Sequence, residues 1–234
     1  HGLHVPAEMD GNPIYAVNTG QTFVYEFEVL NRAGTYWYHA HTHNVTAEQV
    51  YYGLAGLFIV SDDEEQALGL PDGEYDIPIV LQDRSFDDQN QLVYVNHMMQ
   101  RMHGFLGNRI FINGRPDQIL PVAGRSYRLR LLNGSNSRIY KLAWNDGTPI
   151  TVIGVDGGLL ERPENYSYVM LAPGERREIW MDFSGRPTGT ELTMRSIPFS
   201  GSMHQGMMGG GMMGGGMMHG RRGGMMGGGM MSKI

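Results

Sequence analysis

The stretch "TFVYEFEVLNRAGTYWYHAHTHN", residues 22–44, has a two-residue period that predicts β structure. Every second residue of its first part is apolar: Phe23, Tyr25, Phe27 and Val29. A turn at residues 31–34 follows, and the next run, residues 35–43, carries a histidine at every second position from His39 to His43. Because alternate side chains of a strand lie on opposite faces, we expect two consecutive strands, the second with a row of histidines on one face.

The same period returns along the rest of the chain. Short β-rich runs are separated by Asn-Gly, Asp-Gly-Gly and Pro-Gly turns. These runs are "AGLFIV", "DIPIVLQDRSF", "SYRLRLLNG", "PITVIGVDGG", "ERREIWMDF" and "ELTMRSI". Many short strands with turns at this spacing predict an all-β sandwich or barrel. We expect one helix, a short one around Ala47–Tyr52.

The amino-acid composition excludes several classes of partner and of catalytic or metal site. The 234 residues are 41% hydrophobic, which suffices for a buried core, and the formal net charge is −6. No Lys/Arg cluster interrupts the body, so a nucleic-acid partner is not expected. No apolar run is long enough for a membrane span. Cysteine is absent, which excludes disulfides, thiolate zinc sites, a cysteine nucleophile and a blue-copper centre within these residues. No signal peptide is visible, but the sequence does not begin with Met.

The composition also predicts domain boundaries. A Pro- and Gly-flanked linker at residues 68–76 separates a first unit, 1–67, from a second, 77–200. The first unit is shorter than a complete β-sandwich of roughly 100 residues, so we expect it to be truncated. Residues 201–234 are mostly Gly and Met without acidic or aromatic residues, and we expect a low-complexity, disordered segment there.

The histidines are the candidate metal ligands. Residues two apart in a strand lie about 7 Å apart, so His39, His41 and His43 could share one ion or hold neighbouring ions. His1 and His4 form a second group. Imidazole suits copper, zinc, iron and nickel, so spacing alone does not choose the metal. The alternative is a solvated, histidine-rich strand end.

Read together, these segments resemble a known family. "HGLHVPAEMDGNP", followed by "GTYWYHAHTHN" and "GLAGLFIVSDDEE", looks like the first cupredoxin domain of multicopper oxidases, which include laccases and bacterial copper oxidases. "LLNGSNSRIYKL", "VIGVDGGLLERP" and "LAPGERREIWMDF" are similar to the second, copper-free domain of bacterial members. The resemblance covers most of residues 1–200. It implies tandem cupredoxin-like Greek-key β-sandwiches, the first one truncated.

The family has a His-x-His-Gly motif and later a Trp-[Tyr/Phe]-His-x-His motif. His1, directly before Gly2, matches the second histidine of the first motif, and His39 and His41 follow Trp37 in the second. The resemblance implies that these three histidines bind the paired type 3 coppers of a trinuclear cluster. The type 2 copper ligand would lie two positions before His1. We therefore expect an internal fragment that lacks the start of domain 1 and all of domain 3, with its type 1 copper site.

His4 and His43 match no ligand position of the family, and we expect His43 beside the cluster or at its solvent channel. The segment "HMMQRMHG" joins His97 and His103 to three methionines, whose thioethers could hold Cu(I), although Met more often fills gaps in a core. Met pairs also recur every five residues from Met207 to Met218, and two more pairs with the same spacing follow the interruption "HGRRGG". They suggest a second Cu(I)-binding segment, and the alternative is filler without a ligand role.

Three hypotheses for function follow. The first is an oxidase that takes single electrons from phenolic substrates or Cu(I) and reduces dioxygen to water at the trinuclear copper cluster, completed by the missing third cupredoxin domain. Without that domain the chain alone is expected to be inactive. The second is a non-catalytic copper-binding, storage or tolerance protein. The third, in which His1 as a mature N-terminus chelates copper with its amino group, fits the flanking residues least well. The family implies a periplasmic or secreted location.

Overall fold

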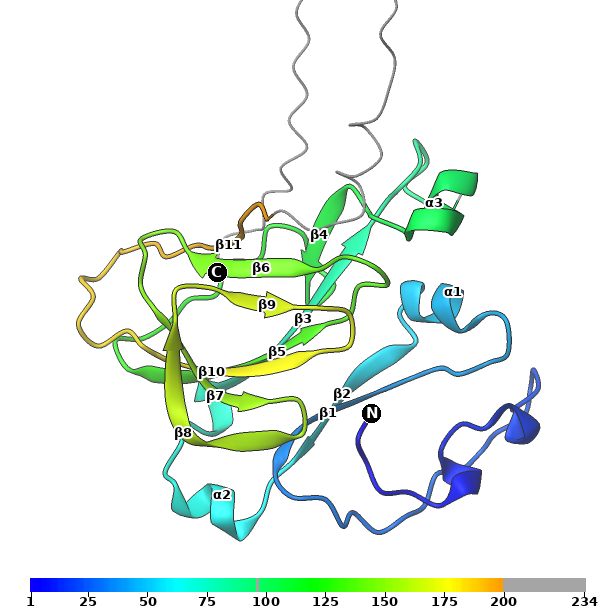
Figure 1. Cartoon of the computed structure of the whole chain (residues 1–234), viewed down its shortest axis with the longest axis horizontal. Helices are drawn as coiled ribbons and strands as arrows, with labels where there is room; N and C mark the ends of the chain where they lie inside the picture. Colours follow the sequence, from blue (N-terminus) through cyan, green and yellow to red (C-terminus); the bar gives the residue numbers. More distant parts are fainter. Residues whose placement is uncertain (96, 200–234) are drawn as a thin grey trace, which may run out of the picture.

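The computed structural model describes residues 1–95 and 97–199, and it is built mainly of β-strands (Figure 1). The strands are β1 (Gly34–His39), β2 (Ala55–Val60), β3 (Asp76–Arg84), β4 (Arg109–Ile112), β5 (Ser126–Asn133), β6 (Tyr140–Trp144), β7 (Ile150–Val155), β8 (Gly158–Tyr166), β9 (Val169–Leu171), β10 (Arg176–Asp182) and β11 (Met194–Ser196). The prediction of an all-β fold is confirmed.

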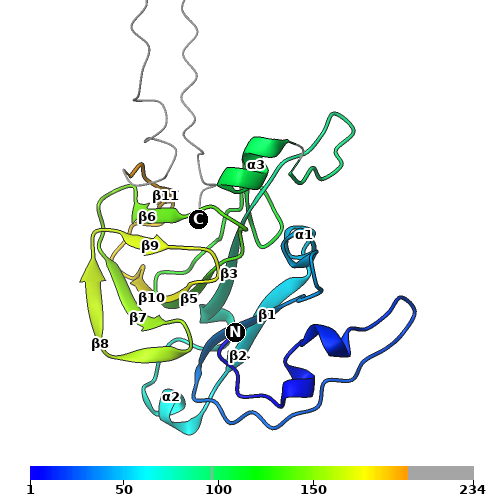
Figure 2. The same ribbon diagram turned by 45° about the vertical axis from the view of Figure 1, so that its right-hand side comes forward.

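The strands form three sheets. A six-stranded sheet has the order β4-β3-β5-β10-β7-β8, a three-stranded sheet has the order β11-β6-β9, and β1 pairs with β2. Within these sheets β3 and β5 run parallel, and every other pair is antiparallel. The six- and three-stranded sheets face each other as a sandwich, and the β1-β2 pair lies beside it (Figures 1 and 2).

One apolar cluster fills the sandwich. Leu129 and Leu131 of β5 and Ile179 of β10 meet Leu142 and Trp144 of β6 in this cluster, and the three aliphatic residues of β5 and β10 are fully buried. Alternation explains why: Leu129 and Leu131 are two residues apart in β5 and share one face of the strand. Arg128 and Arg130 occupy the positions between them and lie on the opposite face.

The helices are short. The predicted helix is confirmed as α1 (Thr46–Tyr51), but α2 (Asp63–Ala67) and α3 (Met98–His103) were not predicted. Two of the 3-10 turns, η1 (Ala7–Met9) and η2 (Pro13–Tyr15), precede β1, and η3 (Gly73–Tyr75) precedes β3. None of the helices in the described part of the chain has the length and apolarity required to traverse a bilayer.

The first part of the opening stretch does not form the predicted strand. Residues 22–30 have no strand assignment, although Phe27 stacks on Phe58 of β2 with ring centroids 6.4 Å apart. A two-residue period favours an extended chain, but a strand also needs a hydrogen-bonded neighbour. The second part is confirmed in shorter form, because β1 ends at His39. The boundaries at residues 67 and 76 stay predictions, and residues 201–234 lie outside the described residues.

Candidate metal centre

The N-terminal segment lies along β1 and brings His1 to the end of that strand. The backbone nitrogen of His1 donates a hydrogen bond to the Trp37 carbonyl oxygen at 2.5 Å. Asn31 fixes the next residues: its side chain donates to the Gly2 carbonyl at 2.8 Å and accepts from the His4 backbone nitrogen at 2.8 Å. These three bonds hold the terminal segment in one register against the strand.

Three rings stack where the segment meets β1. The His1 and Trp37 rings are nearly parallel, with centroids 4.6 Å apart and planes 8° apart. The His39 ring lies 4.9 Å from the His1 ring and 4.7 Å from the Trp37 ring. Trp37 is buried whereas His39 is only partly buried, so the stack has a fixed base and an accessible edge. Flat contact with Trp37 restricts how either imidazole can turn.

The two imidazoles point reactive nitrogens at each other. The Nε2 atoms of His1 and His39 are 2.8 Å apart. Nδ1 of His39 lies 2.8 Å from the Ala40 carbonyl oxygen, which can only accept, so the ring proton sits on Nδ1 and the Nε2 lone pair faces His1. Metal–nitrogen bonds are about 2.0–2.1 Å, so both Nε2 atoms can reach one ion. A carbonyl that orients a ligating histidine is a common feature of metal sites.

His41 lies next to this pair but outside it. Its ring centroid is 5.9 Å from that of His39, and the residue is exposed beyond the end of β1. Within residues 1–95 and 97–199, no three His, Asp or Glu side chains come close enough to hold a single ion together. The arrangement is therefore a converging pair, His1 and His39, with His41 as a third imidazole at its side.

His43 and His4 do not belong to the ring stack of His1, Trp37 and His39. His43 is exposed and follows the end of β1. We expected His39, His41 and His43 on one face of a single strand, but only His39 belongs to the strand. Pairing with the β2 side continues one residue further, where the Ala40 nitrogen donates to the Leu54 carbonyl at 2.9 Å. The chain then turns through Asn44, which has a positive φ of 64°. His4 is exposed and held through its backbone.

The opposite end of β1 is anchored to the six-stranded sheet. Thr35 is fully buried, and its hydroxyl donates to Oε1 of Glu178 at 2.7 Å while accepting from Arg130 at 3.0 Å. Its carbonyl accepts from Nε of Arg176 at 2.9 Å. Thr35 thus uses its backbone and side chain to tie β1 to β5 and β10.

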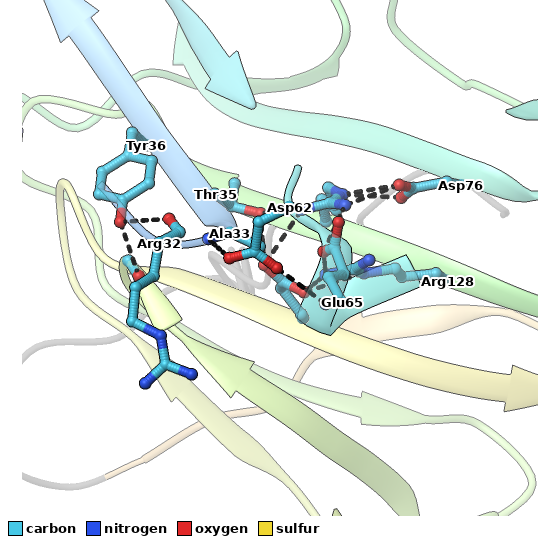
Figure 3. Close-up of polar contacts among 11 residues, drawn as sticks. Arg32, Ala33, Thr35, Tyr36, Asp62, Glu65, Asp76 and Arg128 are labelled. Atoms are coloured by element: carbon cyan, nitrogen blue, oxygen red, sulfur yellow. Dashed lines mark hydrogen bonds and ion pairs between the residues drawn. The ribbon is translucent and has the colours of Figure 1, made fainter. Parts of the chain in front are cut away.

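Around Thr35 lies a buried network of ion pairs, drawn in part in Figure 3. Arg128 pairs with Glu65 at 2.6 Å and with Glu178, and Arg130 pairs with Asp76 at 2.8 Å and Glu178 at 3.2 Å. Burial by itself lowers the pKa of Arg130, but the hydrogen bonds to Asp76 and the charge of Glu178 raise its pKa above the usual value. Glu65 belongs to α2, so the network joins the residues that follow β2 to the sandwich.

The family can be assigned once this geometry is set beside known proteins. Residues 1–65 match the family profile described as multicopper oxidase. The chain belongs to the multicopper oxidase family. Copper is the metal this membership implies, and the prediction made from the histidine motifs is confirmed at that level.

Relatives and solved structures agree. The chain is 40% identical over 185 residues to the cell division protein FtsP of Escherichia coli and 37% identical over 215 residues to a laccase of Bacillus stratosphericus. These matches cover 78% and 84% of this chain but only 39% and 42% of the relatives. Among solved structures, the McoA multicopper oxidase of Aquifex aeolicus matches with 43% identity and a TM-score of 0.77, covering 86% of this chain and 45% of that one. The laccase-like oxidase CueO of Ochrobactrum sp. has 34% identity, a TM-score of 0.79 and the same two coverages.

The residues present fit copper. His1 and His39 offer two convergent imidazole nitrogens, His39 is held in the required tautomer, and imidazole is a good copper ligand. The assignment of His1, His39 and His41 as copper ligands stays a prediction, and the sequence analysis did not anticipate that the rings of His1 and His39 would pack on Trp37. The sequence did contain a signal, because Trp37 is two residues before His39 and so shares its strand face. The contribution of Asn31 had no comparable signal, since it depends on a contact 29 residues away in sequence.

Proposed function

We propose that this chain supplies type 3 copper ligands to the trinuclear cluster of a multicopper oxidase. In this proposal His1 and His39 hold one copper, and His41 holds its neighbour. The observation that carries the proposal is the 2.8 Å approach of the two Nε2 atoms, with the His39 tautomer set by the Ala40 carbonyl. The distance of 5.9 Å between the ring centroids of His41 and His39 supports assigning His41 to a second ion in this proposal.

The proposed reaction couples one-electron oxidation of phenolic substrates or Cu(I) to the four-electron reduction of dioxygen to water. Copper ions at this site would supply the electron transfer and the dioxygen chemistry. The residues of this chain present two convergent imidazole nitrogens, pack the rings of His1 and His39 against Trp37, and let Nδ1–H of His39 donate a hydrogen bond to the Ala40 carbonyl oxygen. The cluster would be completed by residues of a third cupredoxin domain, and a periplasmic or secreted location follows from the family alone.

A copper titration of the 234-residue chain tests the ligand assignment. Pulsed electron paramagnetic resonance of bound Cu(II) detects directly coordinated imidazole nitrogens. We expect two such nitrogens at the tightest site, and His39→Ala to lose the second while His4→Ala changes nothing. An unchanged nitrogen count in His39→Ala would contradict the proposal.

A second candidate function is a non-catalytic copper-binding protein. Two observations favour it: the 234 residues contain no cysteine for a type 1 copper site, and some relatives carry the name cell division protein FtsP rather than an oxidase name. Oxygen uptake distinguishes the two functions. If the purified, copper-loaded chain oxidises a phenol with dioxygen consumption, the non-catalytic function is wrong for this chain.

A further inference from the structure

Helix α3 exposes three methionines that the copper site does not use. Met98 is 74% exposed, Met99 is 56% exposed and Met102 is 67% exposed. Elsewhere, Met181 and Met194 are 4% and 1% exposed and pack in the core of the sandwich. The usual role of Met as a gap-filler in an apolar core therefore accounts for Met181 and Met194 but not for the methionines of α3.

The three exposed side chains share one side of the helix. Successive residues of an α-helix are about 100° apart, so Met102 lies about 40° and Met99 about 100° from Met98 around the axis. Pairs spaced three or four residues apart have Cβ atoms about 5–6 Å apart. Methionine has three rotatable side-chain bonds, so the Sδ atoms of all three can approach one small ion. We call Met98, Met99 and Met102 the methionine face.

The residues that follow α3 pack against the rest of the protein, while the methionine face is exposed to solvent. Immediately after α3, Gly104 has a φ of +90°, and a Cβ there would lie 2.6 Å from Oγ of Ser137. The next residue, Phe105, is 2% exposed, and its ring lies 4.8 Å from that of Tyr51 and 5.2 Å from that of Tyr94. In both ribbon views α3 lies outside the sandwich, on the side of α1 (Figures 1 and 2).

The sulfur donors of the methionine face determine which metal ion it can bind. Thioether sulfur is a soft, neutral donor that prefers Cu(I) to Cu(II) or zinc. Arg101 lies about 60° from Met98 around the axis and is exposed, so its positive charge disfavours a divalent ion more than a monovalent one. Thioethers do not titrate, so binding here would not compete with protons as binding to imidazole does.

We propose that the methionine face of α3 is a binding site for a soft monovalent metal ion, Cu(I) in the natural setting. This site is separate from His1 and His39, and it does not depend on the oxidase function proposed above. It would bind a metal ion whether or not the chain takes part in oxygen chemistry.

The test is a titration of the full 234-residue chain, labelled with carbon-13 at the methionine ε-methyl groups, with Ag(I) in chloride-free buffer. Silver is a redox-inert probe for Cu(I). The single variants Met98→Leu, Met99→Leu and Met102→Leu assign the three signals, since Leu keeps helix propensity and approximate volume. We expect the three signals to shift together, to saturate at about one ion, and to shift equally at pH 8 and pH 5. Zn(II) should leave them unchanged.

A competition experiment with bicinchoninate, a Cu(I) chelator, gives the stoichiometry. The triple Leu variant should bind about one Cu(I) fewer per chain than the parent, whereas Met170→Leu on β9 should bind the same number. Because the methionines after Phe199 can also bind silver, their signals serve as the internal comparison. The proposal is overturned if only those other signals move, if Zn(II) shifts the α3 signals as Ag(I) does, or if the triple variant keeps its full stoichiometry.

Discussion

At strands β5 and β10 both faces of the six-stranded sheet are buried, but different interactions stabilise them. On one face, aliphatic residues such as Leu129 and Ile179 pack against the three-stranded sheet. On the other, Arg128 and Arg130 pair with Glu178 and with acidic residues from α2 and β3 beneath β1. An apolar face loses stability with each contact that is removed, whereas a buried charge that loses its partner also keeps the cost of its desolvation. Strand β1, which ends at the candidate ligand His39, is attached through the charged face.

Removing the carboxylate of Glu178, at the centre of the charged face, should reduce the free energy of unfolding more than any other change described below. Glu178→Ala leaves two buried arginines short of a partner, and we expect a loss of about 3–5 kcal/mol in unfolding free energy. Urea unfolding at pH 7 measures it. The control Glu161→Ala, on the exposed part of β8, should stay within about 0.5 kcal/mol of the parent. Equal effects of the two variants would show that the ion pairs do not hold this face.

Shortening a side chain of the apolar face should reduce the free energy of unfolding somewhat less, because it creates a cavity and leaves no charge unpaired. Leu129→Ala creates a cavity in the sandwich, with an expected loss of about 2–5 kcal/mol. Ile119→Ala, at a residue that is 63% exposed, is the control. The loss should be the same at low and high salt, because the cavity removes apolar contacts and no charge. A loss that salt changes would show that charge contributes to the stability of the apolar face.

The contact between β1 and the charged face can be weakened alone. Thr35→Val keeps the shape but removes the hydroxyl between Arg130 and Glu178, with an expected loss of about 1–3 kcal/mol. Thr35→Ser restores the hydroxyl and should recover most of the stability. Because Thr35 precedes His39 in the same strand, the Val variant should also bind Cu(II) less tightly. If Val and Ser behave alike, the hydroxyl is not the anchor.

The smallest effect concerns acid stability. Asp62 accepts hydrogen bonds from the backbone nitrogens of Ala33 and Glu65, which lower its pKa below the usual value for an aspartate. Its contribution is therefore complete above about pH 4 and is lost as pH falls through the lower, folded-state pKa. Asp62→Asn should give a flatter dependence of urea midpoint on pH in that acidic range. Asp88→Asn, at an exposed position, should leave the dependence unchanged.

Much of the fold was predictable because it follows from local patterns. The β-rich run "SYRLRLLNG" predicted a strand, and β5 (Ser126–Asn133) confirms it. The strand expected at residues 22–30 was wrong, because alternation describes one chain while a strand needs a partner. The helix α2 escaped prediction because it is five residues long, although Asp62 caps it through the Glu65 nitrogen.

The metal centre shows the same division. The motif around His39 and His41 identified the multicopper oxidase family from sequence, while the assignment of individual ligands remains a proposal. Trp37 could have been recognised from its strand face, but the stacking of His1 against it required the terminal segment to fold back along β1. No local pattern in residues 1–4 specifies that path.

The sequence by itself determined which residues alternate, where turns interrupt the strands, and which family supplies the histidine motif. Only the tertiary structure decided that Arg128 and Arg130, which alternation assigns to a polar face, are buried against β1 and α2. It also decided that His1 and His39, 38 residues apart, bring their Nε2 atoms together. The reason is physical: a two-residue period separates the two faces of a strand, but what covers each face depends on how distant segments pack.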